Sequence, residues 1–305
     1  MKHPYILEAT QAYREGRNVA EHLRALLGED ANTGAIIEAA YDLQAGSYVA
    51  SFVSSDNPYP IEIAQILRPH LTEAETILDV GTGECTTLYS VGKHAFSEHH
   101  RLFACDISWS RLRSAVTWLE RTAPEVLDRL SLAVGDMLNL PFQSKSVDVV
   151  WTSHAIEPNG GREREALREL FRVARQKVCL FEPSYEDNSP EGRARMDSHG
   201  YIRGLPEAIA DCGGVLHEKV RLERANNPLN PTFAYIITPP PLAGGEEPPR
   251  RSNLVWACPN TGLALEEEAG FLFCPDAGLA YPILKGLPIL RQDAAILATG
   301  LRRFG

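Results

Sequence analysis

An acidic residue and two closely spaced glycines are the first candidates for ligand binding. The segment from Thr76 to Gly92 reads TILDVGTGECTTLYSVG, with Asp79 placed shortly before Gly81 and Gly83. Glycines at this spacing let the backbone turn sharply and approach a ligand closely. A helix that starts after them would offer free N–H groups and a partial positive charge. The segment therefore predicts a strand, a tight turn and a helix around a ligand site.

Two kinds of ligand fit this turn. A dinucleotide fingerprint, Gly-x-Gly-x-x-Gly, would need a glycine at position 86, where this chain has Thr86. The alternative is a nucleoside site that has no pyrophosphate to bind. Asp106 follows the apolar segment 101–105, and an acid at the end of a second strand can accept hydrogen bonds from ribose hydroxyls in either kind of site. The residues further along the chain must therefore decide between the two.

The order of the later motifs resembles the class I S-adenosylmethionine-dependent methyltransferases. After Asp106 come Gly135-Asp136-Met137, Leu140-Pro141-Phe142 and the apolar segment 146–151, in the order of that family. The resemblance covers roughly Leu71 to Thr238. One departure is visible, because the family often has a third glycine where this chain has Cys85. A small residue still fits at that position.

The resemblance implies S-adenosylmethionine as the cofactor, and it implies roles for residues at the methionine end. Gly81 and Gly83 would let the loop approach the cofactor, while Asp79 would orient the methionine end. Asp106 would accept from the ribose hydroxyls, with Ile107 beside it. For Asp106 the alternative interpretation is a helix N-cap.

At the adenine end, the resemblance implies two further residues. Asp136 would accept from the adenine amino group, and Met137 would lie against the ring.

His154 and Glu157 are the candidate catalytic residues. They follow the fourth apolar segment, at the sheet edge where ligands of open α/β folds bind. Methyl transfer is a direct displacement, so much of the catalysis can come from alignment and exclusion of water. A base is needed only if the nucleophile arrives protonated. The alternative is that His154 packs beneath the cofactor and Glu157 holds a loop.

Two groups of residues are candidates for binding the methyl acceptor. Tyr41 and Tyr48 lie in the N-terminal part of the chain, which in the resembling family commonly covers the cofactor; packing aromatics are the alternative. The second group lies in a polar insert, and its members are Tyr185, Arg195, His199 and Tyr201. Together with Arg193 and Arg203, Arg195 would suit an acidic acceptor, although a solvated charged face is the alternative.

The expected fold is α/β, with a doubly wound, mostly parallel, seven-stranded Rossmann-like sheet. We expect an N-terminal helical cap over residues 1–70, including a helix from about Pro60 to Leu71, and the cofactor-binding domain over 71–239. The fifth strand is expected at Val178–Phe181. A proline-rich linker should span 240–251.

Residues 252–305 should form a small β-rich domain. Cys258-Pro-Asn-Thr-Gly262 and Cys274-Pro-Asp-Ala-Gly278 are nearly matched turns. They resemble those of short zinc-ribbon-like domains, which are found free-standing in bacteria and on activator subunits of tRNA and protein methyltransferases. Two thiolates alone cannot complete a tetrahedral structural zinc site, so we expect no metal. The domain is rich in apolar residues, and we expect some of them to lie against the main domain or a second chain.

Composition narrows the function further. The chain has 305 residues, a formal net charge of −10 and six cysteines. The charge argues against a broad nucleic-acid-binding face. The N-terminal residues have no signal-peptide pattern, and no apolar run is long enough to span a membrane. Reduced thiols in a cytoplasmic protein are therefore expected.

We expect methyl transfer to a small-molecule acceptor, such as a sugar or a biosynthetic intermediate. The alternatives are a tRNA or protein methyltransferase and a non-catalytic cofactor-binding scaffold. For the oligomeric state, a homodimer is the alternative to a monomer.

Overall fold

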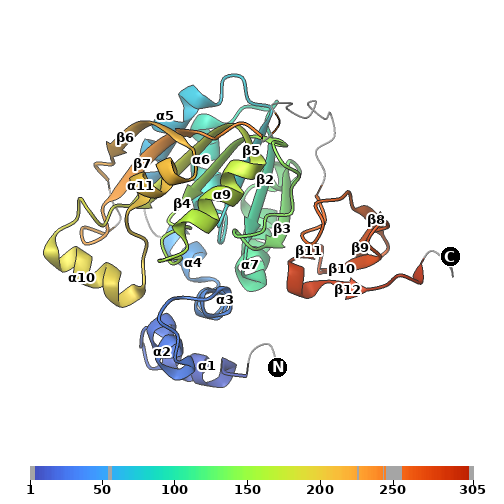
Figure 1. The fold of residues 1–305 in the computed structure, drawn as a ribbon, viewed down its shortest axis with the longest axis horizontal. Helices are drawn as coiled ribbons and strands as arrows, with labels where there is room; N and C mark the ends of the chain where they lie inside the picture. Colours follow the sequence, from blue (N-terminus) through green and yellow to red (C-terminus); the bar gives the residue numbers. More distant parts are fainter. Residues whose placement is uncertain (1–3, 54–56, 225–226, 243, 245–255, 302–305) are drawn as a thin grey trace.

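The N-terminal part of the chain is helical. The computed structural model describes residues 4–53, 57–224, 227–242, 244 and 256–301. The helices that precede the sheet are α1 (Ile6–Arg14), α2 (Val19–Leu27), α3 (Gly34–Asp42), α4 (Ser47–Val53) and α5 (Tyr59–Leu67), followed by the 3₁₀ turn η1 (Arg68–His70). The first three share a small core of their own and form a layer below the sheet in Figure 1.

A mainly parallel sheet forms the centre of the molecule. Its strands in this part of the chain are β1 (Thr76–Val80), β2 (Arg101–Asp106), β3 (Leu130–Gly135), β4 (Val147–Ser153), β5 (Ala174–Pro183), β6 (Val215–Arg221) and β7 (Thr232–Thr238). Their spatial order is β6-β7-β5-β4-β1-β2-β3, with β1 parallel to both β2 and β4. The chain moves outward from β1 in one direction and then returns to β4 on its other side. The carboxyl ends of β1 and β4 therefore flank the crevice in which such folds bind ligands.

Helices cover both faces of this sheet. The helices after β1 are α6 (Thr86–Ala95), α7 (Trp109–Thr122), α8 (Pro124–Leu127), α9 (Glu163–Val173), α10 (Pro190–His199) and α11 (Leu205–Asp211). Of these, α10 lies away from the faces of the sheet, on the side of α2 (Figure 1). One core contains the inward residues of α9 and α11, and the other contains those of α5, α6 and α7. The strands β1 and β4 are almost entirely buried, as expected for parallel strands covered on both faces.

Two local expectations are corrected by the structure, and one helix is added to them. The helix expected at 60–71 ends as an α-helix at Leu67, since Pro69 has no N–H to continue the hydrogen-bond pattern. The fifth strand is longer than 178–181, because it pairs with β4 on one side and β7 on the other. The helix α4 was not expected from the local pattern.

The C-terminal residues extend the central sheet. Their elements are β8 (Glu266–Glu268), β9 (Phe271–Cys274), β10 (Leu279–Leu284), β11 (Leu287–Leu290), the turn η2 (Gln292–Ala294) and β12 (Ile296–Leu297). We call residues 256–301 the C-terminal module. Strand β11 pairs in parallel with β3, with Ile289 opposite Val134 and Leu290 opposite Gly135. Among the described residues the sheet therefore continues beyond the seven expected strands to twelve, and the module lies at its β3 edge (Figure 1). Most of the expected linker, 240–251, lies outside the described residues.

The module shares a core with the main domain. The Trp256 ring lies 5.0 Å from the Phe142 ring and 5.8 Å from the Phe103 ring, between centroids. Ala257 N donates to Pro141 O at 2.8 Å, and Asn139 Nδ2 donates to Pro259 O at 2.7 Å. The expectation that apolar residues of the module lie against another surface is confirmed for the main domain.

The matched cysteine turns lie close together inside the module. The thiol of Cys258 lies 3.2 Å from the Tyr281 hydroxyl, and the Thr261 hydroxyl lies 3.8 Å from the Cys274 sulfur. Among the described residues, no group of three or more histidines, cysteines and carboxylates is placed to hold a metal ion. Across the same residues, no helix combines the length and apolar character needed to cross a membrane.

Candidate active site

The loop after β1 needs glycine at two positions because other residues occupy the space of a side chain. Gly81 has φ of +76° and Gly83 has φ of +58°, both in the left-handed region. A Cβ on Gly81 would lie 2.3 Å from the Ala155 Cβ, and one on Gly83 would lie 2.4 Å from Arg111 Nη2. Cys85 also has a left-handed φ, of +57°. The position at which the resembling family often has glycine therefore has a backbone conformation that glycine adopts readily.

Asp106 joins this loop to the next helix. One carboxylate oxygen accepts from Gly83 N at 2.8 Å, and the other accepts from Ser108 N at 2.9 Å. The N-cap of α7 is Ser108, whose hydroxyl accepts from Arg111 N. The alternative interpretation of Asp106 as the cap is therefore corrected. A carboxylate held at both oxygens has a fixed orientation toward the cavity beside it.

Asp79 lies beneath the loop and is 3% exposed. Burial raises the pKa of its carboxyl to about 7, and the nearby Asp106 charge acts in the same direction, whereas a hydrogen bond with Thr82 acts against it. A positively charged group nearby would favour the ionised form.

A cavity lies over the carboxyl ends of β1, β2 and β3. It is lined by five of the expected cofactor residues, which are Gly81, Asp106, Ile107, Asp136 and Met137. The opposite wall is α3, from which Gly34, Ile37 and Tyr41 face the cavity. A Cβ on Gly34 would lie 3.8 Å from Asp136 Oδ2, so the helix approaches Asp136 closely. We call this the cofactor cavity.

Three charged residues that the sequence analysis missed hold the N-terminal helices on this cavity. Asp42 of α3 accepts from the Ser108 hydroxyl at 2.6 Å and from the Ser110 hydroxyl at 2.9 Å. Glu84 accepts from the backbone N–H groups of Gly46 and Val49, at 2.9 and 2.7 Å, which caps α4. The third, Arg111, lies between these helices and the glycine loop.

The Arg111 guanidinium is buried in the wall of the cofactor cavity. Its central carbon lies 4.5 Å from the Tyr48 ring centroid and 5.5 Å from that of Tyr41. Its Nε lies 4.0 Å from Glu84 Oε1. The sequence held one signal of this role, since Arg111 stands on the inward face of its helix, four residues before Ala115.

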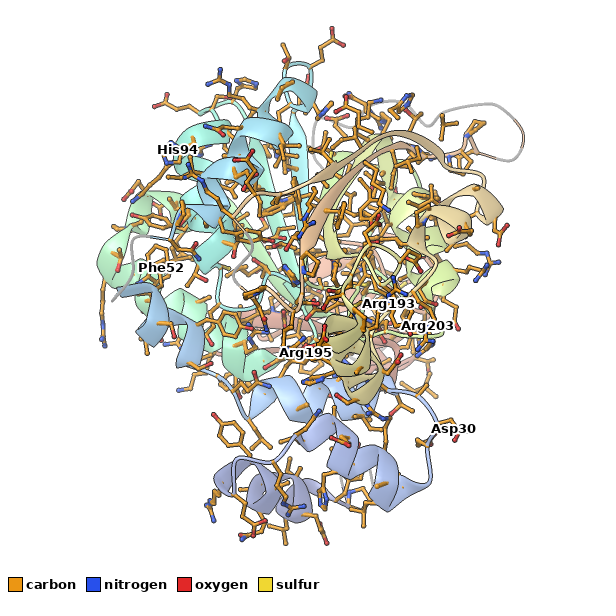
Figure 2. All side chains as sticks on the ribbon, turned by 90° about the vertical axis from the view of Figure 1, so that its left-hand side faces the viewer. Asp30, Phe52, His94, Arg193, Arg195 and Arg203 are labelled. Atoms are coloured by element: carbon orange, nitrogen blue, oxygen red, sulfur yellow. The ribbon has the colours of Figure 1, made fainter. Side chains whose placement is uncertain are left out.

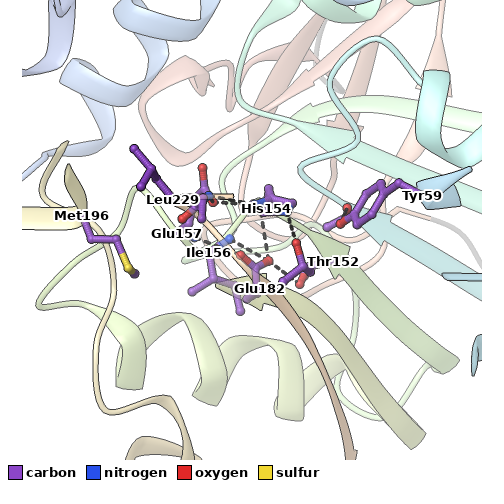
Figure 3. Close-up of polar contacts among 12 residues, drawn as sticks. Tyr59, Thr152, His154, Ile156, Glu157, Glu182, Met196 and Leu229 are labelled. Carbon is purple, nitrogen blue, oxygen red and sulfur yellow. Dashed lines mark hydrogen bonds and ion pairs between the residues drawn. The ribbon is translucent and has the colours of Figure 1, made fainter. Parts of the chain in front are cut away.

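A second cavity, of about 270 Å³, adjoins the first and contains His154 and Glu157. We call it the inner cavity. His154 Nδ1 lies 2.6 Å from Glu157 Oε2, and His154 Nε2 lies 2.8 Å from the Thr232 hydroxyl. Asn230 Nδ2 also donates to Glu157, at 3.0 Å. Figure 3 shows this dyad with Tyr59 on one side and Leu229 on the other.

The dyad favours the ion-pair form. Burial tends to lower the pKa of His154, but the charge and hydrogen bond of Glu157 raise it overall. Burial tends to raise the pKa of Glu157, and His154, with Asn230 and Tyr201, lowers it overall. Both directions stabilise a protonated histidine beside an ionised glutamate.

Glu182 holds the loop that carries this dyad and was missed by the sequence analysis. It is fully buried and accepts from the Thr152 hydroxyl and from three successive backbone N–H groups, 155–157, at 2.7 to 3.2 Å. Burial raises its pKa to about 7. The loop includes His154 in a left-handed conformation, with φ of +54°. The hydrogen bonds of Glu182 to the following residues hold the loop in this strained conformation.

The expected acceptor residues divide into two groups. Tyr41, Tyr48 and Arg195 line the inner cavity, and with His199 and Tyr201 they also line an outer cavity of about 670 Å³. Tyr185 is placed elsewhere, because its hydroxyl donates to Asp197 and its ring lies 4.7 Å from the Arg203 guanidinium. Figure 2 shows Arg195 above the N-terminal helices, toward the middle of the view, with Arg203 nearer the edge.

Comparison with known proteins agrees with this geometry. Residues 77–177 match the family model described as a methyltransferase domain. The chain is 26% identical over 146 residues to a sarcosine/dimethylglycine N-methyltransferase of Aphanothece halophytica, covering 45% of this chain and 50% of that protein. It therefore spans about half the length of the curated relative it matches.

Two solved structures share the fold. The [4+2]-cyclase SpnF superposes with a TM-score of 0.55 at 12% identity, covering 70% of this chain and 98% of that one. A chain from a complex that contains the Haloferax volcanii Trm112 methyltransferase activator has a TM-score of 0.52 at 19% identity, covering 66% and 97%. Residues 77–177 of this protein are thus a methyltransferase domain, with S-adenosylmethionine as its cofactor.

Proposed function

We propose that the whole protein is a methyltransferase that transfers the methyl group of S-adenosylmethionine to a small molecule in the inner cavity. The observation that carries the proposal is that the cofactor cavity and the inner cavity share four wall residues, which are Tyr41, Gly81, Arg111 and His154. A donor in one cavity and an acceptor in the other would meet at this shared wall.

The main contribution of the protein to the reaction is to align the methyl donor with the acceptor. When bound, S-adenosylmethionine supplies an electrophilic methyl group, whose bond to sulfur breaks with its electron pair left on sulfur as the acceptor's lone pair forms the new bond. Asp106 and Asp136 would hold the nucleoside, and the loop held by Glu182 brings His154 to the shared wall. The walls exclude water and fix the line of attack. Because His154 is already protonated in the ion pair, the Glu157 carboxylate is the group of the dyad that receives the acceptor's proton.

The size of the inner cavity supports a small acceptor. It continues into the outer cavity, with which it shares Tyr41, Tyr48, Glu157 and Arg195. A metabolite would fill the inner cavity, and a longer one, such as a sugar derivative, would extend outward. The net charge of −10 does not favour an RNA acceptor. As part of the proposal we place the protein in the cytoplasm, because its six cysteines are free.

The test combines cofactor binding with turnover. S-adenosylhomocysteine should bind in calorimetry, and methyl-labelled S-adenosylmethionine should label a component of a metabolite extract. His154→Ala should lower turnover at least tenfold while changing the affinity for S-adenosylhomocysteine little, and His94→Ala, at an exposed histidine, should change neither. Binding of the cofactor without labelling of any acceptor would support a scaffold. Failure to bind S-adenosylhomocysteine would refute the proposal.

A further inference from the structure

Arg195 is placed differently from the two arginines near it in sequence. Arg193 donates to the backbone oxygen of Glu186 at 2.9 Å, and Arg203 forms an ion pair of 2.7 Å with Asp197. The Arg195 guanidinium instead lies 5.5 Å from the Tyr201 ring centroid and borders both the inner and the outer cavity. Figure 2 shows the same separation of Arg195 from Arg193 and Arg203.

The charges that line the inner cavity do not balance. Its two carboxylates are Glu84 and Glu157, and its basic residues are Arg111, His154 and Arg195. Glu157 pairs with His154 at 2.6 Å, and Glu84 lies 4.0 Å from Arg111 while also accepting from two backbone N–H groups. Arg195 is therefore the cation whose charge no carboxylate of this cavity offsets.

Three buried polar atoms of residues that line the same cavity are also without a hydrogen-bond partner. Within the described residues they are Nε of Arg111, Nη1 of Arg195 and Oδ1 of Asn230. Arg111 Nε faces Glu84 at 4.0 Å, so the two atoms left for a ligand are those of Arg195 and Asn230. The Asn230 amide is oriented by its donation to Glu157, so the free atom is a hydrogen-bond acceptor. Buried polar groups without partners cost free energy. A ligand with an anionic group and an N–H or O–H group would satisfy both atoms.

We propose that the methyl acceptor is a small amino or hydroxy carboxylate, bound through its carboxylate by Arg195 and through its N–H or O–H group by Asn230. The proposal rests on the methyltransferase function proposed above. A guanidinium binds carboxylate and phosphate in the same two-pronged manner. One unbalanced cation beside the ionised Glu157 favours the singly charged carboxylate over a phosphate dianion.

The test measures binding to the full-length protein saturated with S-adenosylhomocysteine. The probes are glycine, sarcosine, dimethylglycine and small hydroxy carboxylates, each paired with its neutral amide, together with inorganic phosphate. At least one carboxylate should bind the wild type, and its amide should bind at least tenfold more weakly. Arg195→Gln should weaken that carboxylate at least tenfold, and Arg195→Lys should weaken it less. Arg193→Gln, on the same helix but outside the cavity, should match the wild type.

Several results would overturn the proposal. They are equal binding of carboxylate and amide, an unchanged affinity in Arg195→Gln, tighter binding of phosphate than of every carboxylate, and binding of no carboxylate at all. A large loss of S-adenosylhomocysteine affinity in Arg195→Gln would assign this arginine to the cofactor, which also overturns it. The comparison of carboxylate with amide needs no variant, so misfolding of Arg195→Gln leaves the test intact. Failure of the wild type to bind S-adenosylhomocysteine would count against the methyltransferase function instead.

Discussion

Replacing Gly81 by alanine should show what the close contact of the glycine loop with Ala155 contributes to stability and cofactor binding. The cost of ordinary backbone strain is measured separately, at a second glycine. Gly81 and Gly28 have nearly the same left-handed backbone, with φ of +76° and +70°. A Cβ on Gly28 would have nothing within 4 Å, whereas one on Gly81 would lie 2.3 Å from the Ala155 Cβ. Gly28→Ala is therefore a matched control that carries the strain without the collision.

The expected magnitudes follow from these contacts. The left-handed backbone should cost each variant about 1–2 kcal/mol of unfolding free energy. Carbon atoms normally approach to about 3.5–4.0 Å, so Gly81→Ala must push Ala155 away by roughly 1 Å or more. That shift strains the bond from Ala155 N to Glu182, worth about 1 kcal/mol. We expect Gly81→Ala to lose about 3 kcal/mol in total.

Affinity for S-adenosylhomocysteine gives the second measurement. The shifted loop carries His154 and borders the cofactor cavity, so Gly81→Ala should bind at least about tenfold more weakly, which corresponds to about 1.4 kcal/mol. Gly28→Ala should bind like the wild type. Urea unfolding and calorimetry measure the two effects. Equal affinities in the two variants would refute the reasoning that the Gly81–Ala155 contact shapes the site.

Three further predictions concern charged residues. Asp106→Ala should weaken S-adenosylmethionine binding by about 2–4 kcal/mol through two lost charge-assisted hydrogen bonds, and an unchanged dissociation constant would contradict the assignment. Arg291→Ala removes the 2.6 Å ion pair between the C-terminal module and Glu38 of α3 and should speed S-adenosylhomocysteine release in stopped-flow, whereas Arg164→Ala, at an exposed ion pair, should not. Because folding raises the Asp79 pKa to about 7, the folded state binds more protons than the unfolded state between about pH 4 and 7. The wild type should therefore lose stability relative to Asp79→Asn as pH rises through this window in urea unfolding, and a parallel pH dependence would show that Asp79 titrates normally.

The central fold could be predicted because its signals are local. The first three apolar segments are followed by a glycine or an acid, and the fourth is followed by His154. The carboxyl ends of parallel strands meet at one edge of a sheet. That rule is enough to expect Gly81, Asp106, Asp136 and His154 near one another, and the structure places all four on the two adjoining cavities. The functional roles of these residues stay predictions.

The supporting contacts could not be predicted because they join distant segments. Asp42 reaches residues 66 and 68 positions later, and Glu182 reaches back 25 to 30 positions. Nothing local distinguishes Arg193 from Arg195, since the helix that carries them has no clear apolar side. The pairing of β11 with β3 joins segments more than 150 positions apart, so the continuation of the sheet had no signal in the pattern of either strand.

That pairing also bears on how copies of this chain can associate. Without β11, β3 would be an edge strand with unpaired N–H and C=O groups, which are a template for another chain. The C-terminal module closes this edge from within the same molecule. The module is joined to β7 by the chain between Thr238 and Trp256. Because β11 of a second copy has the same sequence, it would fit the same edge of β3. Exchange of modules would then give a dimer that needs no interface beyond the one already present in the monomer.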